Sequence, residues 1–195
     1  MFSSLQRCFR PVFRLCRALH TIAWVILVGL CLLISPPLLL AKDPSTPLSW
    51  RAFQEPKYGA VLYYPANWFH EGVAKNGGFE FASSRGDGAV LFLKTSLDPL
   101  RTGAAATVQK LKSGTGAHRI KDIQSGETWY ELRLAPRPGL MQVTRVLFTC
   151  KERIVSAVTL IYPAEQAEAY EAMLKKLKKR FSVGVGTETP VRSCS

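Results

Sequence analysis

Five consecutive apolar residues, 89–93, constrain the fold of this chain more than any other feature. They follow residues 84–88, where Asp87-Gly88 is a strong hairpin signal. The turn predicts that residues 79–83 and 89–96 form paired antiparallel strands. A strand that is apolar on both faces needs a covering layer on each side. The sequence therefore predicts a central strand in a sheet with packing on both faces.

Two segments with helical periodicity can supply these layers. Residues 102–112 carry one apolar stripe and are followed by Gly114 and Gly116, which end a helix. A final helix is predicted to begin at Pro163, since proline suits the first helical position. Its buried face consists of apolar residues at helical spacing, namely Ala167, Tyr170, Leu174, Leu177 and Phe181.

Further strands are predicted from short apolar runs bounded by turn residues. They are residues 50–54, 60–64, 119–124, 128–135, 141–150 and 154–162. The predicted fold class is α+β, an antiparallel sheet flanked by helices in an α/β/α sandwich.

The first 41 residues have the layout of an export signal. Four arginines, Arg7, Arg10, Arg14 and Arg17, stand without any acid and precede the uncharged apolar residues 21–34. This order of a positive region and an apolar region is typical of a secretory signal peptide. The arginines are expected to stay in the cytoplasm, so that the rest of the chain is exported.

Two fates of this segment stay open. Cleavage after Ala41 would release the domain, although Leu39 is bulky where a small residue is preferred. Alternatively, residues 21–41 stay as a membrane anchor, since an uncharged run of 21 residues is near the roughly 20 needed to cross a bilayer. Cys31 gives a weaker lipoprotein alternative. The predicted organisation is a signal or anchor helix (1–41), a linker (42–49), one domain (50–183) and a tail (184–195).

The exported part is basic. Of 26 lysines and arginines, four lie in the first 41 residues, which leaves 22 against 14 acids and a net charge of +8. Such a domain could meet anionic lipid, an acidic polymer or an acidic protein. However, the excess is concentrated in residues 175–180, at the helix end that cations stabilise. We therefore interpret these lysines as solvated, and expect no nucleic-acid partner because no binding motif is present.

The sequence carries no recognisable catalytic or cofactor motif. Of three histidines, His20 lies in the export segment, and neither a G-x-S-x-G elbow nor a phosphate-binding glycine loop occurs. Glu127 and Glu131 alternate along a strand and are predicted to be solvated. We predict no catalytic residue, no cofactor and no metal site. The weak metal candidates are His70, Glu71 and His118. A catalytic zinc site needs three well-placed protein ligands, and this set offers two histidines and one loop carboxylate.

Two other features leave alternatives open. An oxidising compartment would allow a disulfide between Cys150 and Cys194; otherwise Cys150 is a buried strand residue and Cys194 lies on a loose tail. Trp68 and Phe69, at the exit of a strand, are predicted either to pack in the core or to form a partner surface, because aromatic residues are enriched in binding hot spots.

A series of aromatic motifs carries a family resemblance. Residues 58–69 run through Tyr64-Pro65 into Trp68-Phe69, and later come Trp129-Tyr130, Tyr162-Pro163 and a last helix ending at Phe181. Over residues 50–183 this order resembles the PsbP-like family, whose α/β fold is shared with the Ran-binding protein Mog. It is most similar to exported bacterial members without an assigned activity, and some family members bind divalent metals.

The sequence thus predicts a non-enzymatic exported domain, periplasmic or anchored at the outer face of the cytoplasmic membrane. It would act in binding, assembly or maintenance, with a protein partner in the cell envelope, and would contact the membrane through residues 1–41 if these are retained. The alternatives are a weak divalent-metal- or small-ligand-binding protein and, more remotely, a hydrolase.

Overall fold

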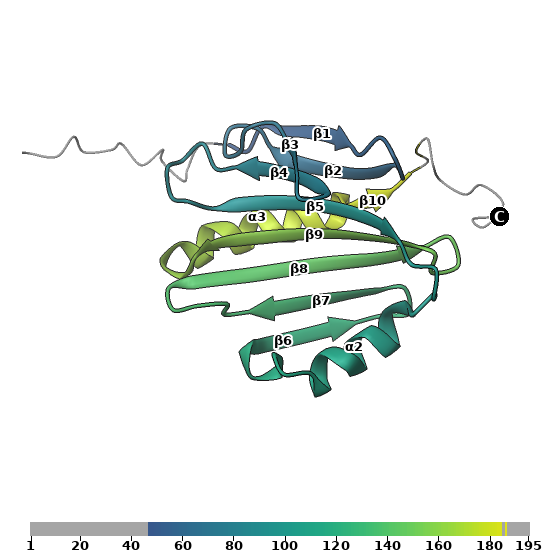
Figure 1. Ribbon diagram of the computed structural model, residues 1–195. Coiled ribbons are helices and arrows are strands. Elements are labelled where there is room, and N and C mark those ends of the chain that lie inside the picture. The colour runs from purple at the N-terminus through teal and green to yellow at the C-terminus, as the bar shows by residue number, and fades with distance from the viewer. Residues whose placement is uncertain (1–46, 185, 187–195) are drawn as a thin grey trace, which may run out of the picture. The chain divides into compact units, whose positions relative to one another are not determined.

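The computed structural model describes residues 47–184 and Gly186 (Figure 1). Its main element is a seven-stranded antiparallel sheet in the order β3-β4-β5-β9-β8-β7-β6. The strands are β3 (Val73–Lys75), β4 (Gly78–Ala82), β5 (Val90–Leu97), β6 (Ile120–Ser125), β7 (Trp129–Leu134), β8 (Leu140–Thr149) and β9 (Ile154–Pro163). A smaller sheet has the order β1-β2-β10. Its strands are β1 (Trp50–Gln54), β2 (Ala60–Pro65) and β10 (Ser182–Val183).

The predicted hairpin is present, and it places the apolar run in the middle of the sheet. β4 pairs with β5 from Phe79↔Leu93 to Ala82↔Val90, and β5 pairs with β9 along its whole length. Leu91 and Leu93 are fully buried, whereas Val90 and Phe92 on the other face are only half-buried. The expectation of complete cover on both faces is therefore correct for one face and partly correct for the other.

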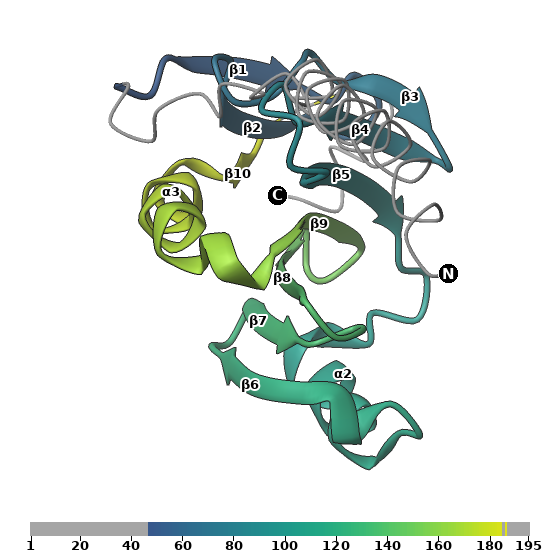
Figure 2. The same cartoon turned by 90° about the vertical axis from the view of Figure 1, so that its left-hand side faces the viewer.

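Two α-helices lie on opposite faces of the sheet (Figure 2). They are α2 (Gly103–Ser113) and α3 (Ala167–Arg180), and the short 3-10 turns η1 (Ala117–Arg119) and η2 (Ala164–Gln166) follow α2 and precede α3. Pro163 keeps the extended backbone of β9, with ψ of 133°, so helical structure starts one residue later than predicted. The observed architecture is the predicted α+β fold.

The main core lies between α3, β2 and one face of the large sheet. β9 alternates with period two: Val158, Leu160 and Tyr162 enter this core, while Val155 and Ala157 pack on the opposite side in a second cluster to which α2 contributes Ala104. The helix contributes four buried side chains, Tyr170, Met173, Leu174 and Leu177. The 3.6-residue period of α3 and the two-residue period of β9 together fix which surfaces meet.

Two short strands were not predicted. β3 has three residues and β10 has two, so neither is long enough to show a periodic pattern. β10 exists because the chain leaving α3 pairs with β2, with Ser182 opposite Val61. This pairing connects the end of α3 to the smaller sheet.

The predicted export segment, residues 1–41, lies outside the described residues. Within the described part of the chain, no helix is both long and apolar enough to span a bilayer.

Leu174 provides a test of how α3 is packed. The Leu174→Ala variant is expected to lower the free energy of unfolding by about 2–5 kcal/mol, because it leaves a cavity in the core. The matched control is Lys176→Ala on the exposed side of the same helix, which should change stability by less than about 0.5 kcal/mol. Urea unfolding of both variants measures the difference, and equal effects would show that the buried face of α3 is misassigned.

Candidate binding face on α3

Glu131 is a buried carboxylate on the face of the sheet that α3 covers. It lies in the middle of β7 with a relative exposure of 3%, opposite Arg145 of β8. Because side chains alternate along a strand, Trp129, Glu131 and Arg133 project from the same face. A buried carboxylate is costly unless cations or hydrogen-bond donors replace its water. The surroundings of Glu131 supply both.

Three cations converge on this carboxylate. Lys178 of α3 approaches its two oxygens at 3.0 and 2.9 Å. Arg133 donates a hydrogen bond at 3.3 Å, and a guanidinium nitrogen of Arg145 lies 3.9 Å from the second oxygen. Each cation keeps about a fifth to a quarter of its side chain exposed. Each of the three cations therefore contacts Glu131 on its buried side and reaches solvent on its other side.

A second carboxylate, Glu171 of α3, extends the network. Arg133 donates to both of its oxygens, and the hydroxyl of Tyr162 donates at 2.9 Å. The hydrogen bond from Arg133 holds the pKa of Glu171 below its ordinary value, while burial and this carboxylate raise the pKa of Tyr162. Because the pKa of Glu171 is lowered by folding, its contribution to stability is present above the ordinary glutamate pKa and is lost in acid.

The exposed surface above this network is basic. Lys175, Lys176 and Lys179 point to solvent from the outer side of α3. On one flank, the Arg145 guanidinium lies 3.8 Å from the centre of the Trp129 ring. On the other flank, Arg180 lies 5.4 Å from the Trp50 ring and 5.9 Å from the Tyr63 ring. We name this surface the α3 basic face: Arg133, Arg145, Lys175, Lys176, Lys178, Lys179 and Arg180, with Trp50, Tyr63 and Trp129.

The cations that neutralise Glu131 and Glu171 also form part of this exposed surface. The α3 basic face has seven cations, of which three pair with the carboxylates Glu131 and Glu171, so the surface is strongly positive. Three of the cations are oriented from below by ion pairs, and two arginines are stacked on half-exposed aromatic rings. Arginine, tryptophan and tyrosine are the residue types that contribute most to protein interfaces. The arrangement is suited to binding an acidic surface.

Comparison with known proteins agrees with this architecture. No protein-family model and no curated protein matches the sequence. Among solved structures, the cyanobacterial PsbP protein CyanoP from Synechocystis sp. PCC 6803 matches with a TM-score of 0.51 at 15% identity, over 76% of this chain and 100% of that chain. The chain has a PsbP-like fold. The Ran-binding protein Mog1p of Saccharomyces cerevisiae matches with a TM-score of 0.47 at 9% identity, over 75% of this chain and 100% of that chain.

The resemblance inferred from the aromatic motifs is confirmed at the level of fold. At these identities the likeness concerns architecture alone. It does not carry an activity or a partner from either protein to this chain.

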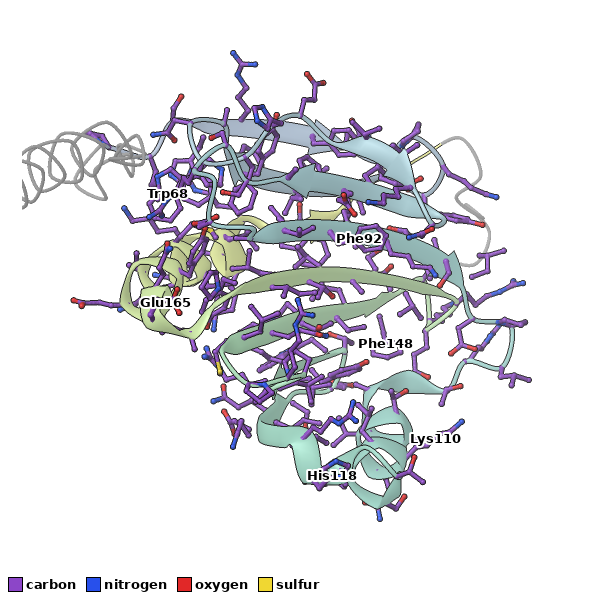
Figure 3. The ribbon with its side chains drawn as sticks, turned by 60° about the vertical axis from the view of Figure 1, so that its left-hand side comes forward. Trp68, Phe92, Lys110, His118, Phe148 and Glu165 are labelled. Atoms are coloured by element: carbon purple, nitrogen blue, oxygen red, sulfur yellow. The ribbon has the colours of Figure 1, made fainter. Side chains whose placement is uncertain are left out.

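Trp68 and Phe69 belong to the core, which is one of the two alternatives that the sequence left open; the other alternative, a partner surface, is wrong. Their relative exposures are 4% and 1%. The Trp68 ring lies edge-on to Tyr170 of α3, with 5.5 Å between ring centres, and the Arg85 guanidinium covers it at 4.2 Å (Figure 3). The chain turns back after Pro65, so these rings enter the space beside α3 instead of leaving the sheet.

The weak metal candidates do not assemble. His70 follows β2 and its backbone N–H bonds to Ala82 of β4, whereas His118 lies in η1 beside β6, at the opposite edge of the sheet (Figure 3). Among the residues that the structure describes, no three His, Cys, Asp or Glu side chains are grouped so that they could hold a metal ion. His70 and Glu71 instead line an open pocket of about 350 Å³ together with Arg51 and Tyr64.

Cys150 is disulfide-bonded, and its pairing with Cys194 remains a prediction. Cys150 lies in the turn between β8 and β9 with a left-handed backbone, φ of 53°. Cys194 lies outside the described residues.

The network corrects one further expectation and supplies the residues that the sequence did not single out. Glu127 is exposed as predicted, but Glu131 is buried and does not occupy a solvated strand position. The sequence does contain a signal: Trp129, Glu131 and Arg133 alternate with apolar Tyr130, Leu132 and Leu134, so both faces of this strand carry large side chains. Only the pairing with β8 and the packing of α3 show which cations reach the carboxylate.

Glu131→Gln tests whether this carboxylate holds the cations. The variant is expected to lose about 1–3 kcal/mol of unfolding free energy, because the amide takes the carboxylate partner from Lys178 and Arg145, whereas Arg133 keeps its pair with Glu171. The cost stays below that of a fully buried pair since the three cations reach water. Glu127→Gln is the matched control on the exposed part of the same segment and should be neutral within about 0.5 kcal/mol. Thermal and urea unfolding measure both, and a neutral Glu131→Gln would contradict the assignment.

Proposed function

We propose that this protein is a non-enzymatic binding domain that docks an acidic protein partner in the cell envelope through the α3 basic face. The observation that carries the proposal is the buried Glu131, which orients Lys178, Arg133 and Arg145 from beneath. Long cationic side chains lose rotamer freedom when they bind, and cations that are already held lose less. The aromatic flanks Trp129 and Trp50 add apolar area beside the charges.

A helix-end lysine cluster can also be a purely solvated surface. Two features distinguish α3 from that case. Its cations continue onto β7 and β8, away from the helix end, and two of its arginines stack on rings from different strands. α2 provides the contrast, because Lys110 and Lys112 lie in its last turn and are exposed (Figure 3 labels Lys110). The two helix ends therefore give a matched pair for experiment.

The double reversal Lys175→Glu and Lys179→Glu tests the docking surface. Binding to poly-L-glutamate, a defined acidic probe, is expected to weaken about tenfold or more, a difference of about 1.4 kcal/mol. Lys110→Glu with Lys112→Glu changes the net charge equally but should weaken binding by less than about threefold. Titration calorimetry at low and moderate salt measures both. Equal weakening by the two variants would mean that only net charge matters, and would overturn the proposed face.

The same pair of variants extends the test to the natural partner. Chemical crosslinking from membranes should recover the same acidic protein with the native chain and with the α2 variant, and lose it with the α3 variant. Unfolding curves of both variants should match the native protein, which separates a binding defect from a folding defect.

We further propose that the domain works outside the cytoplasm, periplasmic or attached to the outer face of the membrane. The support is the sequence of residues 1–41, four arginines followed by an uncharged apolar run. The non-enzymatic part of the proposal is supported by the positions of His70 and His118 at opposite edges of the sheet. Histidine is the most common acid–base residue, and these two histidines do not lie in one site.

A reporter fusion tests the export proposal. Alkaline phosphatase, which is active only outside the cytoplasm, is expected to be active when fused after Pro47. Neutralising Arg7, Arg10, Arg14 and Arg17 is expected to reduce that activity, because the positive region sets the orientation. Activity of a cytoplasm-specific reporter at the same junction would contradict the proposal. Mass spectrometry of the N-terminus then decides between cleavage after Ala41 and a retained anchor.

A small ligand is the second candidate, favoured by the open pocket between β1 and the loop after β2. Arg51 and His70 could donate to an anionic group there, and Glu71 could accept from a cationic one. Burial, followed by the nearby charge of Glu71, raises the pKa of Tyr64, so its hydroxyl stays a neutral donor. Metal analysis and native mass spectrometry of the purified protein would detect such a ligand, and a bound species lost on His70→Ala would favour this candidate.

A further inference from the structure

Two leucines project into solvent at the end of the sheet where β5 stops. Leu97 ends the strand with a relative exposure of 48%, and Leu100 in the following loop has 85%. Single exposed leucines are common on protein surfaces and need no explanation. Here, however, two stand three residues apart, and the backbone around them is held in an unusual way.

Hydrogen bonds to Asp98 hold the conformation of the loop that carries Leu100. Its carboxylate accepts hydrogen bonds from the backbone N–H groups of Leu100 at 3.0 Å and Thr102 at 2.8 Å. The N–H of Arg101 bonds to the carbonyl of Asp98 at 3.2 Å, and Arg101 has a left-handed backbone with φ of 51°. The bond from the Thr102 N–H lowers the pKa of Asp98, so this cap stays ionised at neutral pH. The loop is thus fixed in a form that points Leu100 away from the protein.

The turn between β8 and β9 lies directly beside this loop (Figure 1). The backbone N–H of Asp98 donates to the carbonyl of Arg153 at 2.8 Å. Three successive residues of the turn, Cys150, Lys151 and Glu152, have positive φ values of 53°, 53° and 67°. Left-handed backbone in several consecutive non-glycine residues is strained, and Cys150 in this turn is also held by a disulfide. The two loops form one structure, which we call the tip: Leu97, Leu100, Arg101, Lys151 and Arg153.

Both acids near the tip are engaged by neighbouring backbone. Asp98 is solvent-accessible but caps its own loop, and the Glu152 carboxylate lies against Gly103 at the start of α2, the helix end that favours negative charge. Arg101 and Lys151 are exposed. The surface of the tip combines projecting leucines with exposed cations, and the two carboxylates beside them are occupied by backbone groups and by the start of α2.

We propose that the tip docks the domain on an anionic lipid surface, with Leu100 and Leu97 entering the boundary of the acyl chains and Arg101 meeting lipid phosphates. A bilayer interface accepts a projecting apolar side chain without a complementary pocket, whereas a protein partner must supply one. Basic residues beside the leucines are attracted by the negative potential of anionic lipid. This surface is separate from the α3 basic face and does not depend on the partner proposed for it.

Tryptophan quenching by brominated lipid tests the proposal in the full chain. Leu100→Trp places a reporter at the tip, and Val73→Trp, on β3 with 70% exposure, is the matched control at another exposed apolar site. The vesicles contain brominated phosphatidylcholine with or without phosphatidylglycerol. After subtraction of the native protein's own tryptophan signal, Trp at position 100 should be quenched in the anionic vesicles and Trp at position 73 should not. Leu97→Trp should behave as Leu100→Trp does, which guards against a folding defect of either variant.

Charge dependence completes the test. Arg101→Glu in the Leu100→Trp background should abolish most of the quenching, and so should the omission of phosphatidylglycerol. Absence of quenching at both positions 97 and 100 would overturn the proposal. Equal quenching at positions 73 and 100 would also overturn it, because the protein would then adsorb without a defined orientation. Quenching at position 100 that is unchanged both by Arg101→Glu and by the omission of the anionic lipid would overturn it as well.

Discussion

The buried carboxylate of Glu131 is the constraint on which the relation between α3 and the sheet depends. Apolar packing of Leu174 and Leu177 would tolerate small shifts of the helix along the sheet, because hydrophobic contact is not directional. An ion pair is directional: Lys178 must reach Glu131, and Glu171 must reach Arg133, two helical turns apart on one flank of α3. Meeting both conditions fixes the register of the helix, and with it the path of the chain into β10.

This constraint also decides what the surface displays. Glu131 lies on the inside, so the cations that neutralise it are left with one side in water. At the tip, Asp98 caps its own loop and the Glu152 carboxylate lies against the start of α2, while Arg101 is exposed. In both places carboxylates are engaged in holding the structure, and cations reach the solvent.

Periodic patterns made most of the fold predictable, and contacts between distant segments account for the rest. The hairpin of β4 and β5 and the buried face of α3 follow from local turn chemistry and from spacing alone. Glu131 could not be placed in this way, because a two-residue alternation is identical for a buried and a solvated glutamate. Trp68 and Phe69 are aromatic in either interpretation, and only the return of the chain beside Tyr170 makes them core. β10 depends on pairing with β2.

A leucine at position 131, with apolar neighbours, would hold α3 on the sheet about as well, since well-packed apolar groups often equal or exceed a buried ion pair in stability. Stability alone therefore does not account for a carboxylate there. What the carboxylate does that a leucine cannot is hold Lys178, Arg133 and Arg145 by their charged ends. Cations held in this way are arranged before any partner arrives. The proposed binding surface therefore gives the network a role beyond its part in the fold.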